Sequence, residues 1–535
     1  MAFALAIVAL TCLPYLFGLA ITPPGFQYSG LLGNTDDQNV YLSYLRQAHD
    51  GRLLFTDQFT TEPQQPWFFH IFFLKLGLFS RVSGLSLLLT YQLARVVCGV
   101  LLLLALYLFG ARFLDNLRAR RFFLVFVTLA SGFGWLYLVI FGPGGNHPHP
   151  PDLGPGLVMP ELITFLTLLL NPLFCCAVLL LVATLLLFMA AVEKSSLRLA
   201  LLAGLAAMLL ANIHSYDMIP LALTIVAYLI ARTVLQRRLV IREFAAGAIV
   251  GLMMLPPLLY QFHLYRDLPV FRLKAEVATL SPPLMQYLAA MGLPLLLAIP
   301  GAWLALRRMR QAPDFILPVI WFIAILGSSY LPFPFQRKMA EGMQLPLVLL
   351  ATLALSHFLF ANPKINARAA ALIGGLVVVV SFPSNALFTQ RLLHDLQNMG
   401  ADYYAYLMPP PYLRREQINT LRWLDGKVAA DDGVFCNPML GCYLPANTGA
   451  RTYVGHWAET INYRQKLGAL RDFLSGRMSP RDRADLLHRE NIKYLLIGPE
   501  ESAIAPGAIK LAGLPLREVN RIGEITIFEV EQQAR

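Results

Sequence analysis

The chain has 535 residues, of which 57 % are hydrophobic and only 14 % are charged, and its mean hydropathy is +0.57. Soluble globular chains carry about 25 % charged residues, so this composition excludes a soluble protein and indicates an integral membrane protein. The formal net charge of +11 would favour nucleic-acid binding in a soluble chain, but in a multi-span protein Lys and Arg first set the topology. We therefore expect a lipid bilayer around the chain and no nucleic-acid partner.

Runs of about 20 mostly apolar residues are long enough to cross a bilayer as helices. They predict a polytopic α-helical membrane protein with about 11 transmembrane helices. The runs cover residues 2–21, 86–110, 121–141, 160–191, 198–213, 216–232, 243–262, 284–306, 314–331, 343–360 and 368–387. Asn171-Pro172 interrupts the fourth run, because proline breaks the hydrogen-bond ladder of a helix.

The loops between these runs alternate in their content of Lys and Arg. The basic loops lie near residues 112–121, 194–198, 232–242, 307–310 and 364–368. Residues 142–159 and 214–217 contain neither Lys nor Arg. Because short cytoplasmic loops collect Lys and Arg, we expect a cytoplasmic (inner) membrane protein with its N-terminus inside. The long first loop, 22–85, and everything after residue 387 then lie outside.

The N-terminal apolar run has two interpretations. The small residues Gly18-Leu19-Ala20 resemble a signal-peptide cleavage site, but no basic segment precedes the run. A secretory signal normally has such a segment. We therefore expect the first run to remain as a membrane span.

The composition changes near residue 388, where apolar runs give way to mixed sequence. We expect a transmembrane domain over 1–387 and a small extracytoplasmic α/β domain over 388–535. The patterns predict helices over 414–428, 463–475 and 480–490 and strands over 434–436, 451–454, 494–497 and 524–530. Cys436 and Cys442 either close a short disulfide in an oxidising exterior or remain two thiols.

The first outer loop holds two adjacent acids, Asp36 and Asp37, at the start of a predicted short helix that ends near Gly51. Successive helical residues diverge by about 100°, so only one of the carboxylates is expected to point into a membrane-proximal cleft. One interpretation makes that carboxylate a catalytic base. The other is that both acids merely stabilise the N-terminus of the helix.

Glu62 lies further along the same loop, among aromatic residues. The segment 66–80 that follows has an amphipathic pattern and is expected to lie along the membrane surface. Glu62 is a candidate for substrate binding, whereas the aromatic residues are better explained as an interfacial belt.

His214 and Asp217 form a polar corner between two apolar runs. Residues three apart share a helical face, and this pair suits a phosphate, a metal ion or a sugar hydroxyl. The alternative is that both residues satisfy the ends of the neighbouring helices.

Arg337 and Lys338 lie in a loop expected outside, shortly before Glu341. Short outer loops normally contain few Lys and Arg residues, so these two cations are exceptions. They suit a lipid phosphate or diphosphate, because Arg offers a two-pronged fork and Lys a point charge. Arg272 and Lys274 in a neighbouring outer loop allow the same interpretation. The alternative for all of them is contact with lipid headgroups.

These candidates all map to one predicted side of the membrane. A cleft with acids on one wall and cations on the other suits transfer from a phosphorylated lipid carrier. The cations hold the leaving phosphate, and a carboxylate deprotonates the acceptor hydroxyl.

Several short stretches carry a resemblance to a known family. They are residues 37–43, 60–63, 214–217, 335–338 and 455–460. With the many spans and the outer α/β domain, they make the chain similar to a bacterial branch of the GT-C glycosyltransferases, polytopic enzymes that use polyprenyl-phosphate sugars. The resemblance implies that Asp36 or Asp37 is the catalytic base and that Arg337 and Lys338 bind phosphate.

His456 and Trp457 belong to a loop of the C-terminal domain that is expected to approach the membrane site. Trp457 would offer a stacking platform for a sugar ring, and packing between domains is the alternative role. The sequence identifies no cofactor with certainty, and a divalent metal, where one is used, is expected at Asp36 and Asp37.

The sequence therefore predicts an inverting hexosyl- or pentosyltransferase. It would move a sugar from a polyprenyl-phosphate donor to a lipid, glycan or protein acceptor on the outer face of the membrane. A transporter or flippase for a lipid-linked or anionic substrate is one alternative, although transporters often show internal repeats and none is visible here. A non-catalytic membrane assembly protein is the other.

Overall fold

The computed structural model of the chain describes residues 1–141, 159–401, 407–505, 507 and 509–531. The chain forms two compact units. The first, here called the helical unit, comprises Met1–Leu13, Gln92–His263 and Ala278–Arg391. The second, the α/β unit, comprises Pro14–Tyr91, Leu264–Val277 and Leu392–Arg535. The predicted domain boundary after residue 387 stays a prediction, and most of the predicted outer loop 142–159 lies outside the described residues.

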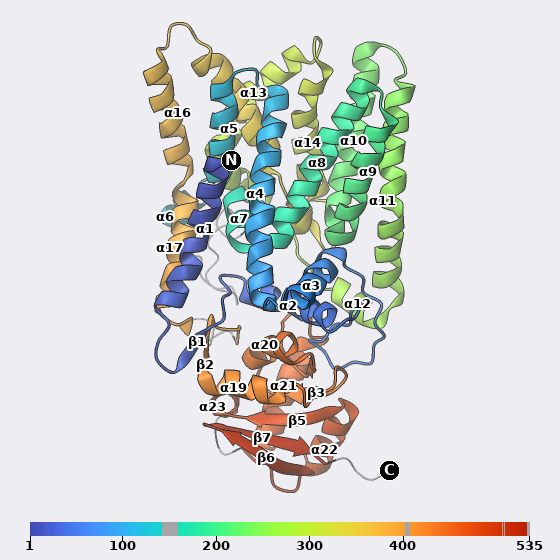
Figure 1. The fold of residues 1–535 in the computed structure, drawn as a ribbon, viewed down its shortest axis with the longest axis vertical. Coiled ribbons are helices and arrows are strands. Elements are labelled where there is room, and N and C mark those ends of the chain that lie inside the picture. Colours follow the sequence, from blue (N-terminus) through green and yellow to red (C-terminus); the bar gives the residue numbers. More distant parts are fainter. Residues whose placement is uncertain (142–158, 402–406, 506, 508, 532–535) are drawn as a thin grey trace. The chain divides into compact units, whose positions relative to one another are not determined.

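Long apolar helices dominate the helical unit (Figure 1). Four of its helices, α1, α4, α11 and α17, have some of their residues in the α/β unit. The helices are α1 (Ala2–Ala20), α4 (Leu87–Phe113), α5 (Leu117–Leu129), α6 (Gly134–Phe141), α7 (Thr164–Leu170), α8 (Pro172–Lys194), α9 (Leu197–Ile213), α10 (Met218–Gln236), α11 (Ile241–Asp267), α13 (Leu284–Arg308), α14 (Leu317–Ser328), α15 (Gln344–Leu355), α16 (Ala367–Ser381) and α17 (Pro383–Gln397). Among the described residues, 8 helices are long and apolar enough to cross a membrane, or 9 if the bent pair α16 and α17 is one span. The prediction of a polytopic membrane protein is confirmed. The count of eleven spans stays a prediction, and Leu197–Ile213 and Pro313–Ser328 are shorter apolar helices.

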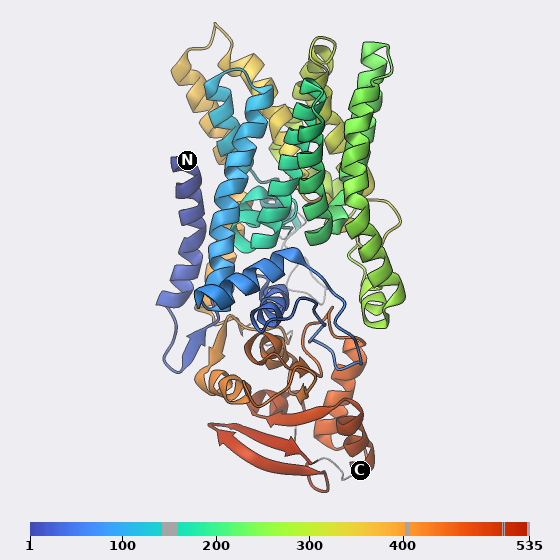
Figure 2. The ribbon, with the colours of Figure 1, turned by 45° about the vertical axis from the view of Figure 1, so that its right-hand side comes forward.

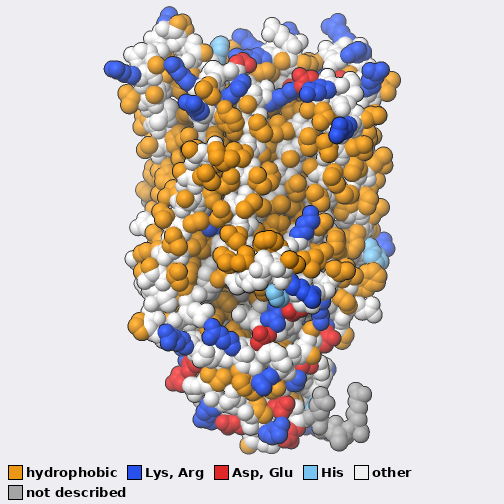
Figure 3. Space-filling view, in the orientation of Figure 1, with side chains coloured by type: hydrophobic (Ala, Val, Ile, Leu, Met, Phe, Trp, Pro, Cys, Tyr) orange, Lys and Arg blue, Asp and Glu red, His pale blue; other side chains and the backbone are white. Residues whose placement is uncertain are grey.

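The flank of the helical unit is apolar, and Lys and Arg gather at one end of its helices (Figure 3). Leu108 on α4, Leu252 on α11 and Ile230 on α10 are 60 %, 65 % and 52 % exposed. Soluble monomers rarely expose so large an apolar surface to water, whereas the apolar tails of lipids match it.

Several of the predicted spans are interrupted. The predicted break at Asn171-Pro172 is confirmed, because α7 ends at Leu170 and the Asn171 side chain caps α8 by accepting a hydrogen bond from the Leu173 N–H at 2.9 Å. A second break, between α5 and α6, was not predicted. There Gly132 packs so closely on α13 that a Cβ would lie 1.7 Å from the carbonyl oxygen of Ala290.

The α/β unit contains a five-stranded sheet of order β4-β3-β5-β7-β6. Its strands are β3 (Gly433–Phe435), β4 (Arg451–Thr452), β5 (Ile492–Ile497), β6 (Leu516–Ile522) and β7 (Ile525–Val530), and its helices after residue 407 are α19 (Arg415–Leu424), α20 (Pro438–Thr448), α21 (Tyr463–Ser475), α22 (Pro480–Arg489) and α23 (Pro499–Ile504). Strand β3 is parallel to β4 and β5, whereas β7 is antiparallel to β5 and β6. Figure 2 shows the hairpin formed by β6 and β7. The sequence predicted β7 and the other strands of this sheet, but it missed β6.

The first loop belongs to the α/β unit. It forms β1 (Phe26–Tyr28), α2 (Thr35–His49) and α3 (Ile71–Ser83), and β1 pairs with β2 (Tyr412–Arg414). The predicted short helix after Asn34 is confirmed as α2. Gly77 lets α3 pack on α2, because a Cβ there would lie 2.4 Å from the Cβ of Ala48. A short helix, α12 (Pro269–Ala275), completes the unit.

The two cysteines of the C-terminal region are free, buried thiols. Cys436 directly follows β3, and Asn437-Pro438 then begins α20, which carries Cys442. The structure therefore shows the second of the two alternatives, without a disulfide.

Candidate functional site

The first turn of α2 presents Asp36 and Asp37 in different environments. The Asp36 side chain is 5 % exposed and that of Asp37 is 43 % exposed. Asn34 does not cap the helix with its side chain but donates a hydrogen bond from Nδ2 to the Asp37 carboxylate. The two carboxylates therefore differ in exposure, but an oxygen of each approaches His456 Nε2, at 3.6 Å from Asp36 and 3.1 Å from Asp37.

His456 and Trp457 contact these acids from the segment that follows β4. The Trp457 Nε1–H donates to Asp36 Oδ2 at 3.1 Å, and His456 Nε2 lies 3.1 Å from Asp37 Oδ1. The backbone N–H groups of Ala458 and Glu459 donate to His456 Nδ1 at 3.0 and 3.2 Å. Since Nδ1 accepts, the ring hydrogen lies on Nε2 and is donated to Asp37.

Asp36 is prepared to take up a proton. Burial raises its pKa above the ordinary value. Its Oδ1 is buried and has no hydrogen-bond partner among the described residues. The Trp457 indole beside it is 41 % exposed, so one oxygen of Asp36 orients an accessible aromatic ring while the other is buried.

Lys274 on α12 fixes the segment that carries His456 and Trp457. Its Nζ lies 3.3 Å from Asp57 Oδ2 and forms a second ion pair with Glu459. Burial lowers the pKa of Lys274, but the charges of Asp57 and Glu459 hold it well above the ordinary value, and burial raises the pKa of Asp57 to about 6. Lys274 is thus engaged in a buried ion cluster, whereas Arg272 on the same helix is exposed.

Glu62 has a structural contact. Its carboxylate lies 2.9 Å from Lys466 Nζ on α21, and it accepts a hydrogen bond from Thr60. Lys466 also donates to Thr61 at 3.1 Å. Glu62 therefore anchors the first loop to α21.

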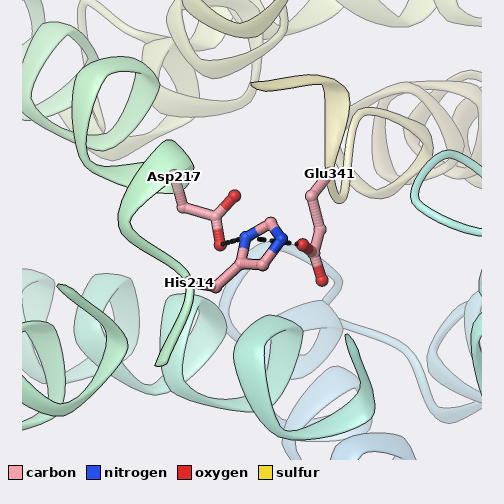
Figure 4. Close-up of side chains that lie close together, drawn as sticks. All are labelled: His214, Asp217 and Glu341. Atoms are coloured by element: carbon pink, nitrogen blue, oxygen red, sulfur yellow. Dashed lines mark ion pairs between the residues drawn. The ribbon is translucent and has the colours of Figure 1, made fainter. Parts of the chain in front are cut away.

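The helical unit contains a second group of sequence candidates. His214 ends α9, Asp217 closes the 3₁₀ turn Ser215–Asp217, and Glu341 follows the 3₁₀ turn Gln336–Ala340. His214 Nδ1 lies 3.0 Å from Asp217 Oδ2 and 2.9 Å from Glu341 Oε2, with the imidazole between the two acids (Figure 4). The pairing of His214 with Asp217 was foreseen, but the contribution of Glu341 was not.

Arg337 and Lys338 lie on the turn before Glu341. Arg337 Nε is 3.5 Å from Glu161 Oε1. Lys338 Nζ donates to Tyr216 Oη at 3.4 Å and lies 4.7 Å from the centre of the tyrosine ring. Glu161 was missed in the sequence, although an acid at the start of an apolar run is costly and therefore informative.

The candidates thus fall into both units. Asp36, Asp37, Glu62, Arg272, His456 and Trp457 belong to the α/β unit, and His214, Asp217, Arg337 and Lys338 belong to the helical unit. A metal at Asp36 and Asp37 stays a prediction. Among the described residues, the one group of three side chains whose ligand atoms could hold a metal ion is His214, Asp217 and Glu341.

No protein-family model matches the sequence, and no curated protein shows a significant match. The fold is similar to that of solved membrane glycosyltransferases. The oligosaccharyltransferase AglB of Archaeoglobus fulgidus, solved with an inhibitory peptide and a dolichol-phosphate, gives a TM-score of 0.54 at 14 % identity over 92 % of this chain and 69 % of AglB. The same enzyme with Zn and sulfate gives 0.54 at 15 % identity over 95 % and 71 %.

The arabinofuranosyltransferase AftD from Mycobacteria is similar over 99 % of this chain, with a TM-score of 0.55 at 15 % identity. The chain spans only 40 % of the AftD chain. Likenesses at this identity concern the fold. The chain has the fold of the GT-C membrane glycosyltransferases, as the sequence resemblance implies.

Proposed function

We propose that the protein is an inverting glycosyltransferase of the inner membrane, which moves a sugar from a polyprenyl-phosphate donor to an acceptor on the outer face. The observation that carries the proposal is the pairing of Asp36 with Trp457 in a chain with the GT-C fold. An exposed indole is a platform for a sugar ring, and a buried carboxylate with a raised pKa suits a general base.

In the proposed reaction, Asp36 takes the proton of the acceptor hydroxyl. The acceptor oxygen attacks the anomeric carbon from the side opposite the phosphate, and the bond between that carbon and the phosphate oxygen breaks with inversion. Asp37 holds His456 beside the base through the contact at 3.1 Å. The departing phosphate carries away the bonding electron pair.

Arg337 and Lys338 are the proposed phosphate ligands. Arg337 has a side chain that is 42 % exposed, so its guanidinium can receive an anion in a two-pronged contact. Binding of dolichol-phosphate by AglB supports a lipid-linked donor for this chain. Glu62, Arg272 and His214 with Asp217 remain proposed contributors to substrate binding.

The test measures sugar transfer by the purified chain in nanodiscs. The donors are radiolabelled short-chain polyprenyl-phosphate hexoses and pentoses, and the acceptors are membrane lipids, glycans and peptides. Mass spectrometry of glycolipids and glycoproteins from cells with and without the gene identifies the product. Loss of one glycan product without the gene, restored by wild type but not by Asp36→Asn, supports the proposal. Donor movement across the bilayer without any transfer would establish a flippase, and restoration of the product by Asp36→Asn would remove Asp36 from the proposed reaction.

A further inference from the structure

The cluster of His214, Asp217 and Glu341 in the helical unit is more than a set of helix caps. One ligand atom from each residue lies within 4.8 Å of the other two. The side chains are 7 %, 1 % and 0 % exposed. Two segments far apart in the sequence supply them, as the ribbon around the sticks shows (Figure 4).

The charges of this cluster do not balance among its own members. Both carboxylates approach the same nitrogen, His214 Nδ1, and a ring nitrogen carries at most one hydrogen. In the described part of the chain, none of the four oxygens of Asp217 and Glu341 has a well-directed hydrogen bond, and neither has Nδ1. Burying ionised carboxylates without such bonds is costly, so buried charges are normally paired or coordinate metals.

We propose that His214, Asp217 and Glu341 bind a divalent transition-metal ion, for which zinc fits best. One imidazole nitrogen and two carboxylate oxygens are ligands that zinc accepts, whereas Mg²⁺ and Ca²⁺ prefer oxygen alone. The metal takes the place of the hydrogen on Nδ1 and neutralises both acids. Three protein ligands are the number found in zinc sites that keep a position open for water or substrate.

The other histidine cluster is a poorer metal site for a reason visible in its contacts. His456 Nδ1 already accepts two backbone N–H groups, and Nε2 faces Asp37 with the hydrogen. Asp36 Oδ2 accepts from Trp457. The structure therefore assigns the metal to His214, Asp217 and Glu341 instead of Asp36 and Asp37.

Metal binding is measured directly on the purified full chain, so the proposal does not depend on the proposed transferase activity. Chelator-treated protein is titrated with Zn²⁺, Mn²⁺ and Mg²⁺, and bound metal is counted by mass spectrometry of the elements. We expect one zinc ion per chain, bound more tightly than Mg²⁺. Glu341→Gln and His214→Ala should each weaken zinc binding at least tenfold, and the matched control His456→Ala should keep it.

Thermal melting separates a metal site from a purely structural ion cluster. With chelator present, Glu341→Gln removes one uncompensated buried charge and should raise the melting temperature above that of wild type. With zinc present, only wild type and His456→Ala should gain stability, because a ligand that binds the folded state stabilises it. Any one of four results would overturn the proposal. Three concern zinc binding: wild type binds no zinc, Glu341→Gln retains zinc, or only His456→Ala loses it. The fourth is a melting temperature of Glu341→Gln in chelator below that of wild type.

Discussion

Two clusters each bring one histidine together with two acids. The first, in the α/β unit, is His456 with Asp36 and Asp37, and the second, in the helical unit, is His214 with Asp217 and Glu341. They differ in how many of their polar atoms have hydrogen bonds. In the α/β unit, His456 uses both ring nitrogens, and Asp37 is 43 % exposed. In the helical unit, His214 directs one nitrogen at two fully buried acids. A histidine with two carboxylates therefore has no fixed role. Hydrogen bonds and exposure favour proton transfer in the first cluster and metal binding in the second.

The first cluster depends on Lys274, and its removal should have the largest effect. Lys274→Met leaves the buried Asp57 and the half-buried Glu459 without their cation, and breaking a buried ion pair in this way costs about 3 to 5 kcal/mol. We expect faster hydrogen exchange over residues 455–460 and a lower melting temperature.

The control for Lys274→Met is Lys493→Met, which removes a partly exposed pair with Asp432 at 3.0 Å and should cost about 1 kcal/mol or less. Adding Asp57→Asn and Glu459→Gln to Lys274→Met should recover most of the stability. Equal melting temperatures for the two lysine variants would show that the buried ion cluster does not hold the segment.

The two acids of the first cluster should differ in activity. Asp36→Asn removes the proposed base and should lower transfer by about 100-fold or more, the usual scale for general-base loss. Asp37→Asn leaves the base in place and weakens only the contact with His456, so its loss should be smaller. Transfer rates at saturating donor, with each variant shown to be folded, test this order. Small and equal losses would remove Asp36 from the reaction.

Local signals in the sequence predicted the local parts of these sites. The start of α2 near Asp36 and Asp37 was predictable because polar caps and apolar periodicity can be recognised over a few residues. The break at Asn171-Pro172 was predictable from the geometry of proline. The partners of these residues were not readable in the same way. Glu341 reaches His214 across more than a hundred residues, and Gly132 packs against the backbone of α13. Such contacts are set by tertiary packing, which local sequence patterns do not encode.

The proposed phosphate ligands offer a smaller effect. Arg337→Ala should lower kcat by roughly tenfold with less change in apparent donor affinity, if the guanidinium stabilises the leaving phosphate in the transition state. Arg337→Lys should not restore the rate, because the planar fork is lost. Lys338→Ala should lose less, since its ammonium already contacts Tyr216 at 3.4 Å. The control is Arg310→Ala, an exposed residue in a predicted cytoplasmic loop, and wild-type turnover in Arg337→Ala would return Arg337 to a lipid-headgroup contact.

The pH dependence of transfer should show the smallest and most specific effect. A base must be ionised, so the rate falls as the pH falls through the pKa of Asp36. Because burial raises that pKa, the acidic limb should lie above the ordinary aspartate value of about 3.9. Trp457→Phe removes an N–H donor that stabilises the ionised carboxylate, so the limb should move further up. A hydrogen bond to a charged group contributes about 1.5 kcal/mol, which corresponds to about one pH unit.

The control is Trp423→Phe, on α19 of the same unit, which should leave the acidic limb in place. If the limb does not move in Trp457→Phe either, Trp457 does not stabilise the ionised form of the base.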